Sequence, residues 1–212
     1  MVDDPPKWRR RKTARSGEII DAALDVFADN GFAGAKLDEI ARRAGLSKGA
    51  LYLYFETKEE IFRAVVRTAV APNLEAVRAA AEAFDGPFVR LVPMILDRMA
   101  RMIGTGRLPA VVKTVIGESR NFPDLAQIWH DDVVGPAIGM LAGFVARAQG
   151  RGEVGAGDPR LYAFSLAGPV VMAMLFRETF GAVGTDLPDL PTLAQQHASV
   201  VLHGMANPKA AP

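Results

Sequence analysis

Apolar side chains recur at helical spacing along most of this chain. Between residues 13 and 30 one face of the repeat is acidic, and the opposite face carries Ile19, Ile20, Ala23, Leu24, Phe27 and Ala28. A period near 3.6 residues indicates amphipathic helices. Alternating β-branched runs and tight hairpin turns, which indicate strands, are missing from the sequence. The pattern therefore predicts an all-α protein.

Glycine, proline and capping residues divide this pattern into about nine helices. We expect helices at residues 13–30, 37–44, 47–55 and 57–84, and then at 88–103, 109–120, 123–149, 158–180 and 189–206. Gly31 and Gly45 supply left-handed helix ends, and Ser47 and Thr57 are good N-caps. Pro72 should kink the fourth helix. The 212 residues are half hydrophobic and 23% charged, which suits one or two soluble globular domains with a substantial core.

The sequence also bears on the compartment. Without cysteine, disulfides and thiolate metal sites are excluded. The basic run near the amino end has no apolar run after it, so no secretory signal is expected. The longest uncharged stretch, between Arg160 and Arg177, is shorter than the roughly 18 to 20 residues of a membrane span, and Gly168-Pro169 breaks it. We expect a cytoplasmic protein with no membrane segment.

Positive charge gathers at the amino end. The formal net charge is only +1, but residues 1–15 hold six basic side chains against two acidic ones, whereas residues 59–212 hold 14 basic and 15 acidic ones. A basic arm at residues 1–12, with Arg9, Arg10, Arg11 and Lys12, is a common device for holding nucleic acid. A solubilising tail is the equal alternative.

Two short predicted helices meet at Gly45-Leu46-Ser47. That arrangement is typical of a helix-turn-helix, whose second helix lies in the DNA major groove. Close approach needs small residues at the leading end, and Ser47, Lys48, Gly49 and Ala50 meet this need. Glycine costs ~1 kcal/mol relative to alanine inside a helix, so Gly49 calls for a reason. A three-helix core without a DNA role is the alternative.

The rest of the reading helix separates into core and contact residues. Leu51 and Phe55 lie four apart and should face the core. Tyr52 and Tyr54 then project on either side of that stripe, where their hydroxyls can reach phosphate oxygens. Lys58 falls in the first turn of the next helix, where free N–H groups already favour an anion.

Residues 13–70 resemble the DNA-binding domain of the TetR family of bacterial transcriptional repressors. The matching stretches are Ile-Ile-x-Ala-Ala-x-x-x-Phe from Ile19, Asn30-Gly31-Phe32, Ile40-Ala41-x-x-Ala44-Gly45-Leu46-Ser47, Lys48-Gly49-Ala50-Leu51-Tyr52, Tyr54-Phe55 and Lys58-Glu59-Glu60. The resemblance implies base and phosphate contacts by Lys48, Gly49, Ala50 and Tyr52, and backbone contacts by Tyr54 and Lys58. It divides the chain into the arm, a helix-turn-helix domain at 13–58, and an effector-binding and dimerisation domain at 59–212.

Two positions depart from the family pattern. Ala35 stands where the family usually has a threonine, so the usual side-chain cap is missing, and Lys36 next to it is expected to supply a charged contact instead. Ala50 replaces a second frequent threonine and favours apolar contact with a thymine methyl group. Both departures bear on the operator sequence rather than on the class of protein.

The larger helical body is apolar and rich in methionine, which adapts to irregular shapes. A pliable effector pocket and ordinary core packing both explain this composition. We expect a small, largely apolar effector, and the candidate lining residues are Met94, Met99, Met102, Phe122, Trp129, Met172 and Phe176. Residues 118–126, ESRNFPDLA, resemble a segment found in a subset of these regulators that includes relatives of multidrug-efflux repressors.

The helix at 158–180 is apolar nearly all round over residues 161–176. In a body this small, such a helix is expected to be covered by another subunit. Together with the helix at 189–206, it predicts a homodimer through a four-helix bundle, as the resemblance also implies. A dimer places two reading helices over a palindromic operator in double-stranded DNA, from which the effector would release this repressor.

No catalytic residue, metal site or cofactor is predicted. The three histidines His130, His197 and His203 lie in no metal-ligand or triad pattern. Asp131 and Asp132 could pair with a hard cation beside His130, but an acidic helix face explains them more simply. An all-helical enzyme remains one alternative, and a DNA-binding protein without an effector is another. A pocket in the body would argue against the second, and a fully packed body would support it.

Overall fold

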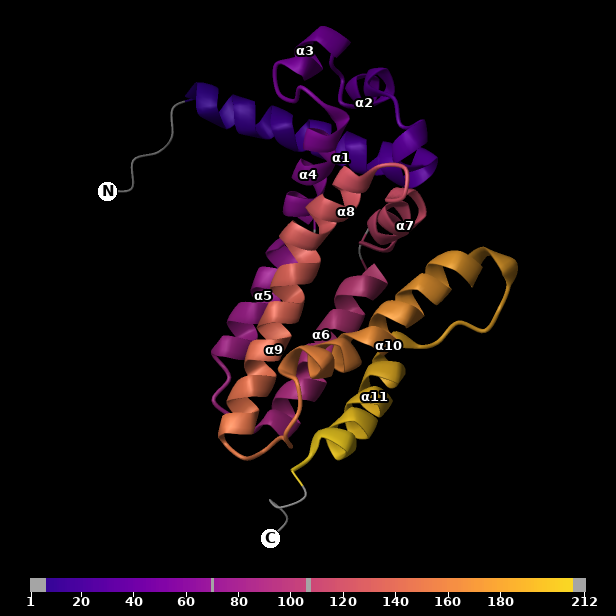
Figure 1. Ribbon diagram of the computed structural model, residues 1–212. Coiled ribbons are helices and arrows are strands. Elements are labelled where there is room, and N and C mark those ends of the chain that lie inside the picture. The colour runs from indigo at the N-terminus through magenta and orange to yellow at the C-terminus, as the bar shows by residue number, and fades with distance from the viewer. Residues whose placement is uncertain (1–6, 70, 106–107, 208–212) are drawn as a thin grey trace. The chain divides into compact units, whose positions relative to one another are not determined.

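The computed structural model describes residues 7–69, 71–105 and 108–207 (Figure 1). Their helices are α1 (Lys7–Gly34), α2 (Leu37–Arg43), α3 (Lys48–Tyr52), α4 (Lys58–Ala69), α5 (Ala71–Glu82), α6 (Phe88–Thr105), α7 (Leu108–Glu118), α8 (Pro123–Trp129), η1 (His130–Val134), α9 (Gly135–Gly150), α10 (Pro159–Phe180), η2 (Gly181–Val183) and α11 (Leu190–Met205). Within these ranges no strand forms beyond an isolated bridge between Val154 and Ala206. The predicted all-α class is confirmed.

The helices group into two compact units. Unit 1 comprises residues 1–70 and 110–129, and unit 2 comprises residues 71–109 and 130–212. The sequence predicts a division near residue 58, with everything beyond it in one domain. The structure instead groups α4, most of α7 and α8 with the amino-terminal helices, because their apolar faces pack there.

The core of unit 1 is aromatic. The rings of Phe27, Phe32 and Phe62 meet with all three centroid separations at 5.6 Å. Ile40 and Leu51 are fully buried beside this cluster. Edge-to-face aromatic contacts add stability beyond the area that they bury. This core holds α2 and α3 against α1 and α4.

The first helix is longer than its pattern predicts. It begins at Lys7 instead of residue 13, so the backbone of the predicted basic arm is helical from Lys7 onward. Gly31 has the expected left-handed conformation, with φ of 69°. The chain bends there, and one further turn continues to Gly34.

Three prolines lie at the start of a helix or inside one. The predicted helix at 57–84 is two helices, α4 and α5, and Pro72 lies in the first turn of α5, where a missing N–H costs nothing. Pro169 lies inside α10, so the helix predicted at 158–180 is confirmed, and Gly168-Pro169 does not interrupt it. Pro93 similarly lies inside α6. Packing against neighbouring helices holds these segments helical despite the lost hydrogen bond.

In unit 2, α10 packs against α6, α9 and α11, and α6 also contacts α5, α9 and α11 (Figure 1). Leu96, Val145 and Val170 are among its buried side chains. The loop after α9 is tied down at both ends. Glu153 accepts a hydrogen bond from the Phe88 N–H at the start of α6, and Gly155 donates to the Met205 carbonyl at 2.8 Å.

Two helical stretches, Pro123–Gly150 and Pro159–Val183, are long and apolar enough to cross a membrane by length and composition. The core helix of a soluble protein passes the same test. Each stretch packs against other helices, and only 28% of the apolar window in Pro159–Val183 is buried. The first stretch is not a single α-helix, because a π-helical turn, His130–Val134, separates α8 from α9.

Candidate nucleic-acid interface

The turn between α2 and α3 has the geometry that its sequence predicts. Gly45 has a φ of 66°, in the left-handed region. Its N–H donates to the Arg42 carbonyl at 3.1 Å, and the Leu46 N–H donates to the Ala41 carbonyl at 2.8 Å. These two bonds form a Schellman ending, which satisfies the last carbonyls of α2. The turn therefore closes a helix-turn-helix.

Ser47 begins α3 as predicted. Its Oγ accepts a hydrogen bond from the Ala50 N–H at 3.2 Å. The helix has only five residues, Lys48–Tyr52, and ends earlier than the predicted 47–55. Thr57 similarly accepts from the Glu60 N–H at 3.1 Å, but the Glu60 carboxylate reaches the N–H of Glu56 rather than that of Thr57.

The outer side of α3 is exposed and small at its leading end. Gly49 is exposed, has no left-handed backbone, and a Cβ there would meet no atom within 4 Å. Tyr52 is 45% exposed, whereas Leu51 beneath it is fully buried. Leu53, which the sequence analysis does not select, is 77% exposed beside Tyr52. Because Tyr52 is predicted to project from the core stripe, the position of Leu53 directly after it could have indicated that Leu53 is exposed as well.

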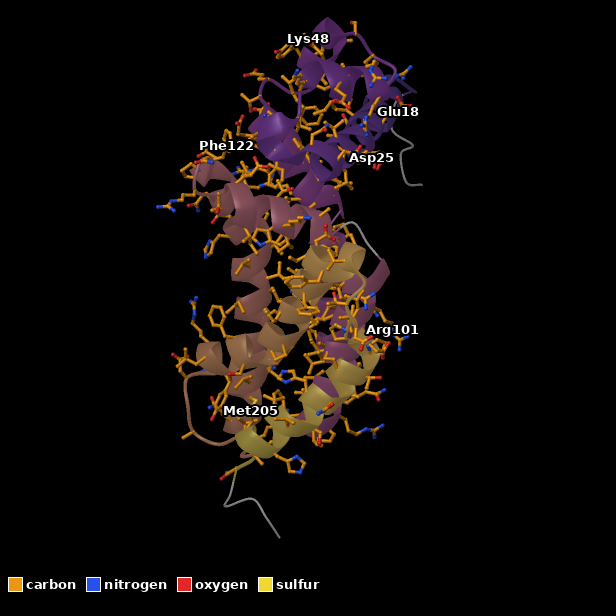
Figure 2. The ribbon with its side chains drawn as sticks, turned by 90° about the vertical axis from the view of Figure 1, so that its right-hand side faces the viewer. Glu18, Asp25, Lys48, Arg101, Phe122 and Met205 are labelled. Carbon is orange, nitrogen blue, oxygen red and sulfur yellow. The ribbon has the colours of Figure 1, made fainter. Side chains whose placement is uncertain are left out.

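Lys48 projects at the end of unit 1 away from Phe122 (Figure 2). Its Nζ lies 3.1 Å from the Asp38 carboxylate on α2. The hydrogen bond that Lys48 donates to the Asp38 carboxylate raises the pKa of Lys48, so the side chain stays charged across the physiological range. The pair is exposed and its attraction is modest, so a phosphate can compete for the lysine.

The remaining predicted contacts lie around this helix. Tyr54 is half-buried and Ala50 is half-buried. Lys36 is exposed and occupies the N-cap of α2 without a side-chain cap hydrogen bond. Ala35 is only 4% exposed, so it packs inward where the family pattern has a polar residue.

Lys58 has partners inside unit 1. Its Nζ donates to the carbonyl of Phe32 at 2.6 Å and to that of Ala35 at 3.2 Å. The ammonium also lies over the Phe32 ring, 4.4 Å from its centroid. The sequence predicts a phosphate contact for this lysine, and the structure gives it a role in holding the end of α1.

Arg9, Arg10, Arg11 and Lys12 lie in the first turns of α1. Their side chains fall outside the part of the chain that the structure describes.

The predicted effector residues are divided between the two units: Phe122 and Trp129 belong to unit 1, and the five others belong to unit 2. Phe122 packs edge-on against Phe32 in unit 1, with ring centroids 5.1 Å apart (Figure 2). Met172 is 62% exposed on α10. Met94, Met99, Met102, Trp129 and Phe176 are each half-buried. A pocket role for these seven residues stays a prediction.

Unit 2 contains a small apolar cavity of about 10 Å³ between α6, α9 and α10. It is lined by Phe88, Val92, Ile95, Leu96, Leu141, Phe144 and Leu166, none of which the sequence analysis selects. The sequence shows these residues as ordinary apolar positions, and only packing brings them together. A cavity of this size holds about one water molecule.

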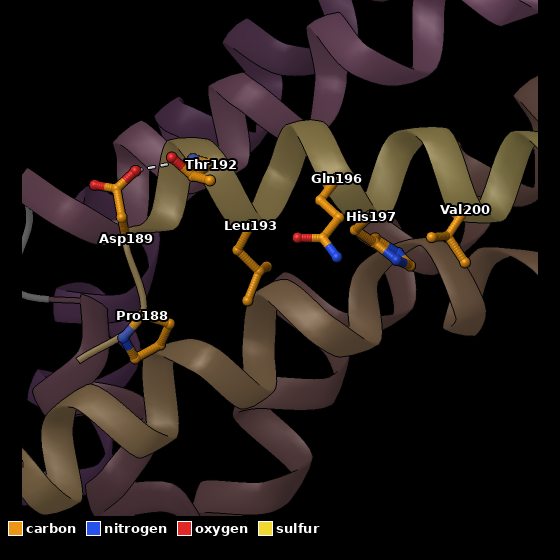
Figure 3. Close-up of a pocket in the computed structure, with 7 residues that line it drawn as sticks. All are labelled: Pro188, Asp189, Thr192, Leu193, Gln196, His197 and Val200. Atoms are coloured by element: carbon orange, nitrogen blue, oxygen red, sulfur yellow. Dashed lines mark hydrogen bonds between the residues drawn. The ribbon is translucent and has the colours of Figure 1, made fainter. Parts of the chain in front are cut away.

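Two open clefts lie on the surface of unit 2. One, of about 440 Å³, follows the side of α11 and includes Leu193, His197 and Val200 (Figure 3). His197 Nε2 lies 3.0 Å from the Ser165 carbonyl of α10, which ties the two helices together. The other, of about 220 Å³, has Met174 and Ile103 in its wall and Arg177 with Glu178 beside them.

Metal-ligand clusters are not found in the described ranges: no three His, Asp or Glu side chains lie together as a candidate set. The reading helix α3 carries the exposed side chains of Lys48 and Tyr52, which can present donors to base edges and phosphates.

Comparison with known proteins agrees with this geometry. Residues 19–65 match the family model described as bacterial regulatory proteins, tetR family, and residues 92–189 match the model described as tetracyclin repressor-like, C-terminal domain. The transcriptional repressor BepR of Brucella suis is 31% identical over 157 residues, which cover 68% of this chain and 73% of BepR. The chain belongs to the TetR family. The helix-turn-helix of α2 and α3 is thus the expected DNA-reading element of a TetR-family chain.

Other similarities cover less of the relative or show the fold alone. The regulator SrpR of Pseudomonas putida is 46% identical over 67 residues, so this TetR-family chain spans only 32% of SrpR's length and 29% of its own. The structure of FadR from Bacillus subtilis in complex with stearoyl-CoA superposes with a TM-score of 0.73 at 21% identity, covering 89% of this chain and 98% of FadR.

Proposed function

We propose that this TetR-family protein is a DNA-binding transcriptional repressor that reads a palindromic operator with α3. The observation that carries the proposal is Gly49. Neither its backbone conformation nor its surroundings in the protein require a glycine, because a Cβ would meet open space. Glycine is a weaker helix former than alanine, by up to ~1 kcal/mol. A partner that approaches α3 closely from outside, such as the edge of a DNA major groove, supplies the missing reason.

Selection of bound duplexes from random DNA tests this function. We expect a preferred site with two half-sites, whose centres are about one helical turn apart or a multiple of it. Binding should weaken steeply with salt, because phosphate contacts release counterions. Lys48→Ala should reduce the slope of log affinity against log salt by about two, because each subunit of the dimer loses one phosphate contact. Binding that is absent, or equal on all duplexes, would contradict the function.

The repressor is proposed to act as a homodimer through α10 and α11. Support comes from apolar side chains that point outward on both helices: Leu161, Phe164 and Met172 of α10 are 66%, 54% and 62% exposed, and Val200 of α11 is 65% exposed. Leu161, Phe164 and Met172 repeat at helical spacing, so they lie on one face of α10. A second copy would cover this face.

The effector is proposed to be largely apolar and to enter the cavity between α6, α9 and α10. Every side chain lining that cavity is apolar. The similar fold of FadR accommodates stearoyl-CoA, which supports an amphiphile with a long alkyl chain as the class to test. At about 10 Å³ the cavity must open before it holds such a molecule. An effector that prefers the opened state would therefore shift the population away from this one.

A regulator without an effector is the second candidate. The cavity between α6, α9 and α10 has room for only about one water molecule, and this small volume favours a body that binds no effector. Thermal unfolding with and without palmitate or stearoyl-CoA separates the two candidates. An effector of this class should raise the unfolding temperature and lower operator affinity at the same concentration. If a broad panel of amphiphiles changes neither quantity, the second candidate stands.

A cytoplasmic location and a lack of enzymatic activity complete the proposal. The match to regulatory proteins supports both. Fractionation of cells that express the tagged chain tests the location, and a protein recovered with the membrane would contradict it.

A further inference from the structure

The segment Glu118–Leu125, ESRNFPDL, which we name the corner segment, joins α7 to α8. It lies within the residues that match the C-terminal family model, yet it belongs to unit 1 with the helix-turn-helix. The sequence marks it as a motif, and DNA recognition by α3 leaves it without a role.

Glu118 caps the turn that follows Gly31. Its Oε1 accepts a hydrogen bond from the Phe32 N–H at 2.7 Å, and its Oε2 accepts from the Ala33 N–H at 2.5 Å. These N–H groups open a new helical turn after the bend, so they have no carbonyl partner in the preceding turn. A Cβ on Gly31 would overlap Oε1 of Glu118, and its φ of 69° also disfavours any side chain. The bend and the carboxylate therefore fit together.

The other end of the same turn is held by a cation. Lys58 of α4 donates to the Phe32 and Ala35 carbonyls at 2.6 Å and 3.2 Å. Phe122 covers the Phe32 ring from the side of the corner segment, and Leu125 is fully buried. An anion at the start of a turn and a cation at its end both favour the helical dipole.

This turn sets the direction in which α2 leaves α1. The N-cap of α2 is Lys36, which provides no side-chain cap, and Ala35 lacks a hydroxyl that could do so. The start of α2 therefore relies on the preceding turn for its position. Because α3 packs directly on α2, the turn also positions the reading helix.

We propose that the corner segment is a clamp on the turn after Gly31 and that Glu118 is its positioning residue. While Glu118 and Phe122 hold the turn, α2 and α3 are fixed in the orientation that reads DNA; without these contacts the turn loosens and sequence-specific affinity falls. The inference rests on the proposed function.

The test compares Glu118→Gln with Asp124→Asn, an exposed carboxylate in the same segment, in the full-length protein. Affinity is measured on the selected operator and on a random duplex over a salt series. Amide hydrogen exchange is measured at Phe32 and Ala33 in the free protein. Glu118→Gln should lower operator affinity at least tenfold, leave random-duplex affinity and the salt slope unchanged, and speed exchange at both amides. Asp124→Asn should change none of these quantities by more than twofold.

Operator affinity of Glu118→Gln within twofold of the wild type would overturn the clamp. So would a loss of affinity with unchanged exchange at Phe32 and Ala33, or an equal loss on operator and random duplex, since partial unfolding gives that result. If Glu118→Gln does not fold, Phe122→Leu is judged by the same measurements. Wild-type protein that binds no selected duplex would sink the proposed function itself, whereas the exchange measurement needs no DNA and reports on the contact alone.

Discussion

At the scale of single residues, the interface depends on the missing side chain of Gly49 as well as on the exposed side chains beside it. Gly49 leaves open space at the leading end of α3, while Lys48 and Tyr52, four residues apart, share a neighbouring face of the same helix. Leu53 adds an exposed apolar side chain. A lysine, a tyrosine and a leucine around a bare backbone can contact phosphates and thymine methyl groups at once.

The Gly49→Ala variant should change the stability of the protein and its affinity for the operator in opposite directions. The new Cβ meets no atom in the protein, so we expect stability to rise by up to ~1 kcal/mol through helix propensity. The same methyl group should hinder close approach to DNA and lower operator affinity about tenfold, or by ~1.4 kcal/mol. Urea unfolding and fluorescence anisotropy measure the two effects.

Gly139→Ala is the matched control. Gly139 is exposed on α9, and a Cβ there also meets no atom within 4 Å. It should stabilise the protein similarly and leave DNA affinity unchanged. Equal DNA affinity for Gly49→Ala and Gly139→Ala would remove Gly49 from the interface.

At the scale of elements, the short reading helix depends on its first residue. With only five residues, α3 has few internal hydrogen bonds, and the Ser47 cap supplies one of them. We expect Ser47→Ala to cost ~1 kcal/mol of unfolding free energy in urea, and Ser47→Asn, which can still cap, to cost much less. Equal losses for the two variants would show that the cap does not stabilise α3.

The loop after α9 fixes the start of α6 through one carboxylate. Burial works to raise the pKa of Glu153, but hydrogen bonds from the Arg151 side chain and the Phe88 N–H outweigh it and leave the pKa lowered. A lowered folded pKa means that this contribution to stability is present above the unfolded value, about 4.3, and is lost as the pH falls through the folded value.

Glu153→Gln should therefore flatten the fall in stability between about pH 5 and pH 3, because it removes a group whose protonation destabilises the fold. Urea unfolding at a series of pH values measures the slope. Asp186→Asn, at an exposed loop position, is the control. A slope for Glu153→Gln that equals the wild-type slope would show that this carboxylate does not link pH to stability.

At the scale of the whole molecule, assembly and DNA reading are expected to depend on each other. Phe164→Glu places a charge on the exposed apolar face of α10 without removing a buried side chain. We expect a monomer by light scattering, and operator affinity at least 100-fold weaker because only one half-site is held at a time.

Val89→Glu, at a side chain 58% exposed on α6, is the control for charge and for the loss of an exposed apolar residue. It should remain dimeric and bind the operator as the wild type does. A dimeric Phe164→Glu protein would place the interface elsewhere.

A structural feature can be predicted from the sequence when the interactions that produce it join residues close together in the chain. Gly45 and Ser47 end and begin helices through bonds to residues at most five positions away, so their roles are readable in the sequence and confirmed in the structure. The helix predicted at 158–180 is also confirmed, although Pro169 lies inside it, because packing against α6, α9 and α11 holds α10 helical despite the lost hydrogen bond.

By itself, the sequence determined the all-α class, the order of the helices, the helix-turn-helix and the family, since helical periodicity and capping are short-range effects. Only the tertiary structure decided which apolar residues surround the cavity of unit 2, that Phe122 packs in unit 1, and that Lys58 turns to backbone carbonyls. The contact between Glu118 and Phe32 joins residues 86 positions apart. No local pattern specifies such a contact, because it forms only when burial of the aromatic core brings α7 against the end of α1.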